Sequence, residues 1–220
     1  MGIIAIVQGF KAKKLGYTGG KANVAIILGI IGIVLWVYIL VHSILPFVTN
    51  PAGGADHTGS YQTLNVSESG LTIQIPANWV VGHSSQDAVL EMNDPAQNKG
   101  FFVIEELKED FADGFALEDY VTAIRQNMSV NSDTPEAPEI IDVQIGDGIS
   151  ARQFVMSITL NYTKLSYQVT CVDANGYFFQ FIGWSVRSEY AKAETVFNDI
   201  LGNISFTTNM VPVSLQRYRI

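Results

Sequence analysis

The sequence contains one cysteine, Cys171, so no disulfide can form within the chain. It carries no acidic residue before Asp56 and has no internal repeat. It also has no HExxH, GxSxG or P-loop motif, no cysteine pair, and no GxGxxG that opens a helix. These absences exclude a disulfide-rich scaffold. The sequence also lacks the motifs that define zinc proteases, α/β-hydrolases and nucleotide-binding enzymes.

A long apolar run is the strongest feature that is present. Residues 24–41 are 18 consecutive positions without charge, amide or proline, and 13 of them are Ile, Leu or Val. A helix crosses the bilayer core with about 20 apolar residues. At roughly −0.3 to −0.6 kcal/mol per residue, these side chains favour insertion by about 4 to 8 kcal/mol. We therefore predict a transmembrane helix at residues 23–48, which meets the lipid bilayer through residues 24–48.

The charges on either side of this run predict its orientation. Four lysines and no acidic residue precede it, whereas 21 acidic and nine basic residues follow it. Positive charge beside a first span stays in the cytoplasm. Residues 1–22 are therefore predicted to be a basic cytoplasmic segment of a single-pass protein in the cell membrane, with the later domain extracytoplasmic. Cleavage after Ala55 is the alternative, but a signal peptide has an apolar region of only about 7–15 residues.

The N-terminus carries a resemblance of its own. MGIIAIVQGF is an apolar segment too short to span, and KAKKLGYTGGKANVAIILGIIGIVL follows it. Together, residues 2–41 resemble a small two-helix membrane domain common in bacterial proteins, with the anchor in the place of its second half. The resemblance implies a truncated first helix. An interfacial segment beside the anchor is the other interpretation.

The composition after the apolar run predicts a linker, one folded domain and a C-terminal tail. Residues 49–60 contain Asn, Pro, Gly and Ser and are predicted to be a flexible linker. Residues 61–207 suffice for one domain with its own core, and residues 208–220 form a tail. With 21 acidic and nine basic residues after the run, this portion has a charge of about −12, which disfavours nucleic acid. It should also be repelled by anionic lipid headgroups.

Alternating apolar and polar residues predict strands. A half-buried strand at 71–75 is followed by a turn after Pro76, and Trp79 is predicted to pack back onto the core. NYTK and DANG predict hairpin turns. The other predicted strands are 88–92, 101–107, 140–146, 150–160, 165–172 and 177–186.

Two segments have the helical period instead. Residues 115–130 place Leu117, Tyr120, Val121, Ile124 and Met128 on one face. Residues 188–204 place on one stripe Tyr190, Ala193, Val196, Phe197, Ile200 and Leu201. The order of strands, a helix, further strands and a last helix predicts an α+β fold, an antiparallel sheet with helices packed on it.

The same segments resemble the PsbP-like fold over residues 60–207. GLTIQIPANWVV, FFVIEEL, ALEDYVTAI, IGDGISARQFVMSI, the long hairpin and EYAKAETVFNDILGNISF occur in the order typical of that fold. It includes the extrinsic photosystem protein, the Ran-binding Mog proteins and small bacterial surface proteins. The resemblance implies an α/β/α sandwich. It implies no activity, because the telling elements are an I-P-x-x-W turn and an aromatic-rich last helix, and a fold does not fix a function.

An acidic segment is the best candidate for a site. EELKEDFADG brings together five carboxylates within nine residues, namely Glu105, Glu106, Glu109, Asp110 and Asp113. Calcium takes six to eight oxygen ligands, so weak calcium binding is one interpretation. The spacing is not that of an EF-hand, and a solvated strand end is the other interpretation.

The remaining reactive residue types are scattered. His42, His57 and His83 are too far apart in the sequence to predict one metal site, and Cys171 alternates with Leu165, Tyr167 and Val169 as a buried side chain does. His83 is followed by Ser84 and Ser85, but neighbouring residues usually point apart. Four N-x-S/T triplets begin at Asn65, Asn127, Asn161 and Asn203; several fall in predicted strands or helices, which favours chance.

The predicted strand 177–186 has aromatic side chains on both faces, and each face needs a part of the chain to bury it. Tyr177, Phe179 and Phe181 take one face, while Phe178, Ile182 and Trp184 take the other. Helices should cover one face. The other is either covered by the tail or left open as a recognition surface.

The leading prediction is a membrane-anchored extracytoplasmic domain that binds a ligand or a protein partner without catalysis, cofactor or resident metal. One alternative is a hydrolase acting on cell-surface carbohydrate through a carboxylate pair drawn from Glu105, Glu106, Glu109 and Asp110, which would need a cleft with two of them about 5 to 9.5 Å apart. Another is an accessory subunit of a membrane complex, with Gly29 and Gly32 at a helix contact.

Overall fold

The computed structural model describes residues 60–66, 69–82, 88–94, 96–129, 132–133, 137–160 and 162–207. The predicted transmembrane helix, the linker before residue 60 and the tail 208–220 lie outside these residues, as do all three histidines. Within the described ranges, no helix has the length and apolar character needed to cross a membrane.

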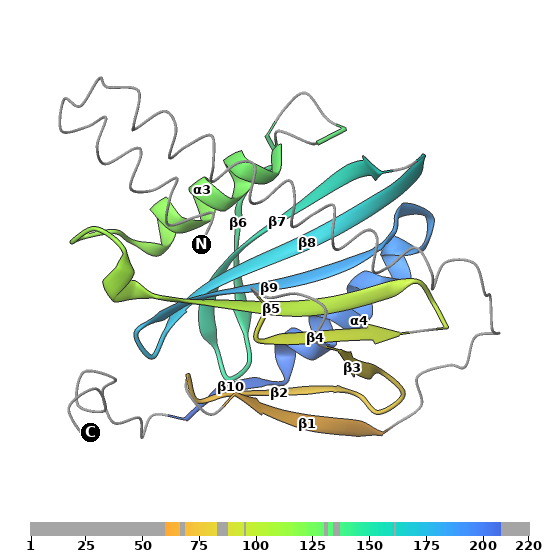
Figure 1. Cartoon of the computed structure of the whole chain (residues 1–220), viewed down its shortest axis with the longest axis horizontal. Helices are drawn as coiled ribbons and strands as arrows, with labels where there is room; N and C mark the ends of the chain where they lie inside the picture. The colour runs from red at the N-terminus through yellow and green to blue at the C-terminus, as the bar shows by residue number, and fades with distance from the viewer. Residues whose placement is uncertain are drawn as a thin grey trace.

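The domain is built around a seven-stranded antiparallel sheet (Figure 1). Its strands, in spatial order, are β3 (Val80–Gly82), β4 (Leu90–Asp94), β5 (Lys99–Leu107), β9 (Tyr177–Val186), β8 (Thr163–Ala174), β7 (Ile149–Leu160) and β6 (Ile141–Ile145). A second sheet holds three strands in the order β1 (Tyr61–Val66), β2 (Leu71–Pro76) and β10 (Ile204–Phe206). Short 3-10 turns, η1 (Lys108–Asp110) and η2 (Arg187–Glu189), follow β5 and β9.

Two helices complete the layers, α3 (Leu117–Ser129) and α4 (Tyr190–Gly202). Each buries the stripe that its sequence predicts: Tyr120, Val121 and Ile124 are buried on α3. On α4 the buried residues are Ala193, Phe197, Ile200 and Leu201. The α+β, PsbP-like fold class is confirmed by this arrangement.

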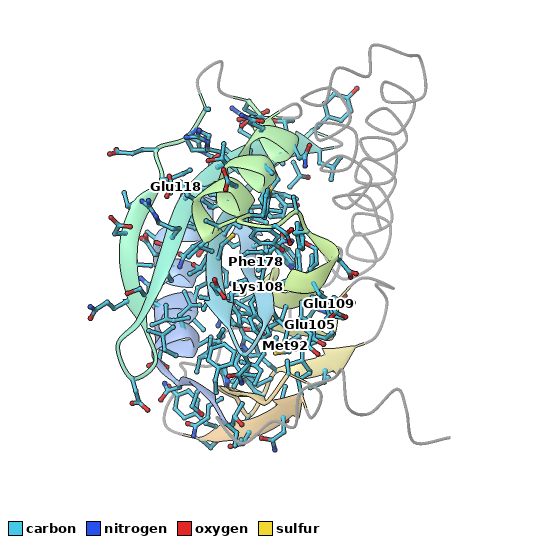
Figure 2. All side chains as sticks on the ribbon, turned by 90° about the vertical axis from the view of Figure 1, so that its left-hand side faces the viewer. Met92, Glu105, Lys108, Glu109, Glu118 and Phe178 are labelled. Atoms are coloured by element: carbon cyan, nitrogen blue, oxygen red, sulfur yellow. The ribbon has the colours of Figure 1, made fainter. Side chains whose placement is uncertain are left out.

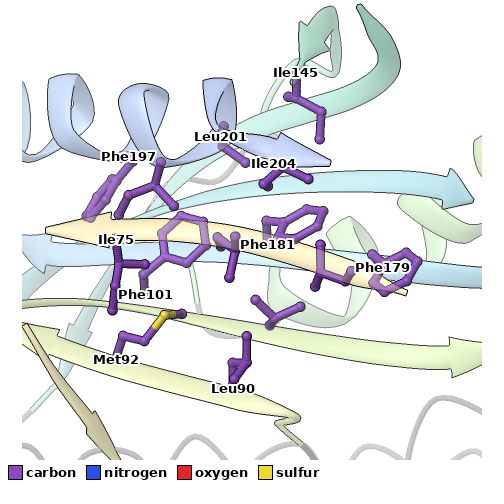
Figure 3. Packing of buried hydrophobic residues seen from close by; sticks show 14 of the residues in the cluster. Ile75, Leu90, Met92, Phe101, Ile145, Phe179, Phe181, Phe197, Leu201 and Ile204 are labelled. Atoms are coloured by element: carbon purple, nitrogen blue, oxygen red, sulfur yellow. The ribbon is translucent and has the colours of Figure 1, made fainter. Parts of the chain in front are cut away.

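The large sheet is covered on both faces, which gives the domain two cores. The first core lies between the sheet, α4 and the small sheet, where Phe101, Phe181 and Phe197 meet (Figure 3). Trp79 belongs to it, as predicted. The second core lies under α3, where Tyr120 stacks on Phe178 with ring centroids 4.6 Å apart.

The prediction that one aromatic face of β9 could be an open recognition surface is wrong. Tyr177, Phe179 and Phe181 belong to the first core, and Phe178, Ile182 and Trp184 to the second. All six are at most 7 % exposed. The small sheet and α4 take one side and α3 the other, so the tail is not needed as a cover.

The structure also contains elements that the pattern did not predict. Strands β3 and β10 have three residues each, and the six-residue β1 alternates exposed with half-buried positions. The predicted strand at 71–75 is β2, the centre of the small sheet, because it pairs with β1 on one side and β10 on the other.

Tight turns set the register of the long hairpins. β8 and β9 join through Asn175 and Gly176, whose φ angles are 50° and 81°, as a two-residue hairpin turn of the Asn-Gly kind requires. β7 and β8 join through residues 161 and 162, since Leu160 pairs with Thr163.

Candidate functional site

The structure separates the five carboxylates of the acidic segment. Glu105 and Glu106 are consecutive on β5, so their side chains point to opposite faces of the sheet. Glu109 and Asp110 lie on the exposed η1 turn, and Asp113 is exposed in the loop after it. Across the described residues, no group of three or more His, Cys, Asp or Glu side chains is arranged to hold a metal ion. The calcium interpretation gains no support from this geometry.

Glu106 is engaged in a polar network under α3. The Tyr120 hydroxyl donates to Glu106 Oε2 at 2.6 Å, and Gln180 Nε2 donates to the Tyr120 hydroxyl oxygen at 2.8 Å. Gln180 Nε2 also lies 3.4 Å from Glu106 Oε2. Because β5, β9 and α3 each supply one member, the network ties the helix to the middle of the sheet.

Burial dominates the protonation behaviour around this network. It raises the pKa of Tyr120 well above its ordinary value, and the charge of Glu106 adds to the rise. Burial, with a smaller contribution from Glu106, also raises the pKa of the Cys171 thiol. A thiol held in its neutral form is a poor nucleophile. Cys171 is therefore a packed core residue, as its alternation predicts, and it is fully buried.

A second connection holds the start of α3 to the edge of the sheet. Arg152 on β7 pairs with Glu118 on α3, and its Nη1 lies 2.9 Å from Asp142 Oδ1 on β6. Figure 2 shows Glu118 well apart from Glu105 and Glu109. Exposed ion pairs of this kind contribute little each, so this connection orients the helix more than it stabilises it.

Lys108, the first residue of η1, contacts the ends of β8 and β9. Its Nζ lies 2.5 Å from Asp173 Oδ2 and 5.2 Å from the centre of the Phe178 ring (Figure 2). Its backbone N–H donates to the Gly176 carbonyl at 2.9 Å. The residue in the middle of the acidic segment is therefore a structural cation between a carboxylate and an aromatic ring.

A buried ion pair lies in the hairpin between β4 and β5. Lys99 Nζ is 3.6 Å from Asp94 Oδ2, with both side chains at most 4 % exposed, and it donates to Gln97 Oε1 at 2.6 Å. Desolvation lowers the pKa of Lys99, and Asp94 opposes that shift. The sequence pattern does not predict this pair, because a lysine at the end of a polar turn is normally expected to be exposed.

Two of the N-x-S/T asparagines, Asn65 and Asn127, lie in regular structure, and Asn203 lies in the turn between α4 and β10. Asn65 Oδ1 accepts from Thr72 Oγ1 at 2.9 Å, Asn203 Nδ2 donates to the Asp199 carbonyl at 2.8 Å, and Asn127 is half-buried on α3. Asn161 lies outside the described residues.

Glu105 and Glu106 do not converge as a glycosidase pair would need, because they point to opposite faces of the sheet and Glu106 is bound by Tyr120. Sequence reasoning missed the partners of Glu106. The one available signal was Gln180, an amide in the centre of the apolar strand YFFQFIGW. A buried amide needs hydrogen-bond partners, and the structure supplies Tyr120 and Glu106.

The fold and these contacts define the class: the described chain is an α+β domain with the PsbP-like fold, whose buried polar groups mainly connect one element to another. Among solved structures it is similar to cyanobacterial PsbP (CyanoP) from Synechocystis sp. PCC 6803, with a TM-score of 0.51 and 13 % identity over 72 % of this chain and 100 % of that one. At this identity, the likeness shows the fold alone.

Two other solved structures are similar at lower TM-scores. The Ran-binding protein Mog1p of Saccharomyces cerevisiae matches with a TM-score of 0.46 and 8 % identity over 67 % of this chain and 95 % of that one. LpqN of Mycobacterium tuberculosis, described as involved in cell envelope biogenesis, has a TM-score of 0.46 and 14 % identity over 67 % and 91 %. No model of a known protein family matches the sequence. No curated protein matches it either.

Proposed function

We propose that the chain is a single-pass membrane protein whose tethered PsbP-like domain binds a partner outside the cell and does not catalyse a reaction. The observation that carries this proposal is the order of three features. A basic segment precedes the uncharged residues 24–41, and an acidic folded domain begins at residue 60. Such an order is that of an anchor, a linker and a displayed domain.

The described contacts support a binding role over a catalytic one. The half-buried Glu106 and the buried Asp94 are held by Tyr120 and Lys99. The single thiol is buried and its pKa is raised. A reaction centre instead presents its nucleophile and base toward a bound substrate. These groups stabilise the domain, which leaves its exposed surfaces for recognition.

Labelling in intact cells tests the proposed orientation. A bacterial host would express two full-length variants, Tyr162→Cys in the outer domain and Lys13→Cys in the basic segment. Because Cys171 is buried, the introduced thiol is the reactive one in each variant. A membrane-impermeant maleimide should label Tyr162→Cys in intact cells and Lys13→Cys only after lysis.

Two results would overturn the proposal. One is the reverse labelling pattern. The other is extraction of the chain from the membrane fraction by alkaline carbonate, which removes peripheral proteins but leaves membrane-spanning ones in place. To test the absence of catalysis, the purified chain would be incubated with cell-wall glycans. Hydrolysis that disappears in Glu105→Gln or Glu109→Gln would replace the binding role with the hydrolase alternative.

A further inference from the structure

The hairpin between β7 and β8 ends in an aromatic side chain that nothing covers. Tyr162 is 102 % exposed, the highest value among the exposed large hydrophobic side chains that the structure describes. Its φ angle is +67°. The other two described non-glycine residues with positive φ are Asn98 and Asn175, and asparagine tolerates this conformation far better than tyrosine. A strained, exposed aromatic residue at a turn is a reason to look for a function there.

Two basic residues stand beside this turn. Lys164 is exposed at the start of β8, and Arg187 is exposed at the start of η2. Leu165 pairs with Val186, so Lys164 and Arg187 follow at neighbouring positions at the end of the same ladder. Among the exposed basic side chains of the described ranges, these two make no ion pair, whereas Lys192 pairs with Glu189 at 3.1 Å. Tyr162, Lys164 and Arg187 form what we call the hairpin-end surface.

Figure 1 places this surface on the same side of the domain as the start of β1, but at the opposite corner of that side. β1 begins at Tyr61. In Figure 1 its start lies at the lower right, the β7–β8 turn lies at the upper right, and the first turn of α4 lies between them. The η1 turn and the β8–β9 turn lie at the other end. That opposite end carries the exposed acidic residues Glu109, Asp110 and Asp113.

We propose that the hairpin-end surface contacts the anionic headgroup layer of the bilayer that holds the anchor, which orients the domain with its acidic end away from the lipid. This inference rests on the proposed membrane tether. Lysine and arginine near an anionic leaflet are attracted to it. Tyrosine places an apolar ring and a hydroxyl at the boundary between hydrocarbon and water.

The net charge of the domain favours the bilayer over a second copy of the chain as the partner of the hairpin-end surface. The portion after residue 50 has 21 acidic and nine basic residues, so two copies repel each other at long range. The same excess of acidic residues would repel the domain from anionic lipid in every orientation except the one in which Lys164 and Arg187 face the lipid. The headgroup layer also lies within reach of a flexible linker of residues 49–60.

A lipid-quenching experiment on the full chain tests the contact. A fluorescent label would be attached at Ser188→Cys, an exposed position on η2 that leaves Tyr162, Lys164 and Arg187 intact. The control label is at Asp113→Cys, at the opposite end. Both proteins would be reconstituted in vesicles that contain a headgroup-level quencher, made either of phosphatidylcholine alone or of an equimolar mixture with phosphatidylglycerol.

The expected result is quenching at Ser188→Cys in the anionic vesicles, little in the neutral ones, and little at Asp113→Cys in either. Removing one charge, as in Lys164→Gln or Arg187→Gln, should reduce the contacting population about fivefold. Tyr162→Gly should weaken it as well. Glu189→Gln, a neutralisation of an acidic neighbour, should strengthen it, which serves as the control of opposite sign.

Several outcomes would overturn the proposal. Equal quenching at both labels, or quenching indifferent to phosphatidylglycerol and to Lys164→Gln and Arg187→Gln, would remove the headgroup contact. Release by inorganic phosphate where chloride of equal ionic strength has no effect would assign the surface to a soluble anion. Quenching that depends on protein density would assign it to a second copy. If the chain does not incorporate into the vesicles, the membrane tether fails too; incorporation without quenching defeats this inference alone.

Discussion

The hydroxyl of Tyr120 on α3 donates a 2.6 Å hydrogen bond to Glu106 on β5, and the Tyr120 ring stacks on Phe178. One side chain therefore joins the helix to the sheet by both a polar and an apolar contact. Gln180 donates to the same hydroxyl oxygen, so the hydroxyl acts as donor and acceptor at once. The helix depends on this residue more than on any exposed ion pair.

Tyr120→Phe should destabilise the domain by about 1 to 3 kcal/mol, because it removes a buried hydrogen bond to a charged group and leaves the apolar stacking in place. Urea unfolding followed by tryptophan fluorescence measures the change. Tyr162→Phe is the matched control and should change stability by less than about 0.5 kcal/mol, since that hydroxyl is exposed. Equal effects of the two substitutions would contradict the assigned role.

Gly183→Ala should destabilise the domain by about 1 to 3 kcal/mol. A Cβ at this position on β9 would come within 2.5 Å of the Phe197 ring of α4. Gly202→Ala is the control, because a Cβ there meets nothing within 4 Å. A smaller aromatic partner should relieve the clash, so Gly183→Ala should cost less in a Phe197→Leu background than alone. Strict additivity in that double-mutant cycle would show that the two positions do not touch.

Tyr162→Gly should stabilise the folded domain by about 1 kcal/mol, because glycine adopts positive φ without the steric cost that a side chain incurs. Thermal unfolding measures the gain. Tyr162→Ala keeps a Cβ in the same backbone conformation and should not reproduce it. A loss of stability in Tyr162→Gly would mean that the ring has contacts that outweigh the strain.

Cys171 should resist modification as long as the domain is folded. It is fully buried, and burial raises the pKa of its thiol, so little thiolate forms at neutral pH. Mass spectrometry after maleimide treatment should show no adduct on the native chain and one adduct in denaturant, because the chain has a single cysteine. Rapid labelling without denaturant would show that the second core opens readily.

Stability should fall in alkaline solution above pH 10. Burial raises the folded-state pKa of Tyr120 and Tyr167 above the ordinary value of 10.0. A group with a raised folded pKa contributes stability that is complete below its unfolded pKa and is lost as pH rises through the folded one. Lys99, whose pKa is lowered, acts in the opposite direction over the interval below 10.5. Tyr167→Phe should flatten the alkaline decline measured by urea unfolding between pH 8 and 11, whereas Tyr162→Phe should not.

Local periodicity was enough to predict both helices and most of the large sheet. The stripes on α3 and α4, the hairpin turn at Asn175 and Gly176, and the burial of Trp79 and Cys171 follow from spacing alone. Strands β3 and β10 escaped prediction because each has three residues, too few for an alternation to be read. Spacing along the acidic segment did not indicate that Glu105 and Glu106 point to opposite faces, which follows from their consecutive positions on β5.

By itself, the sequence determined the order of the longer strands and the two helices, the α+β class and the prediction of an anchor, because each of these depends on residues close together in the chain. The tertiary structure alone decided that the ten strands of the described residues form two sheets, that both faces of β9 are covered, and that Glu106 meets Tyr120 and Gln180. These contacts join residues 14 and 74 positions apart from Glu106. Their partners are selected by the packing of whole layers, which no local pattern encodes.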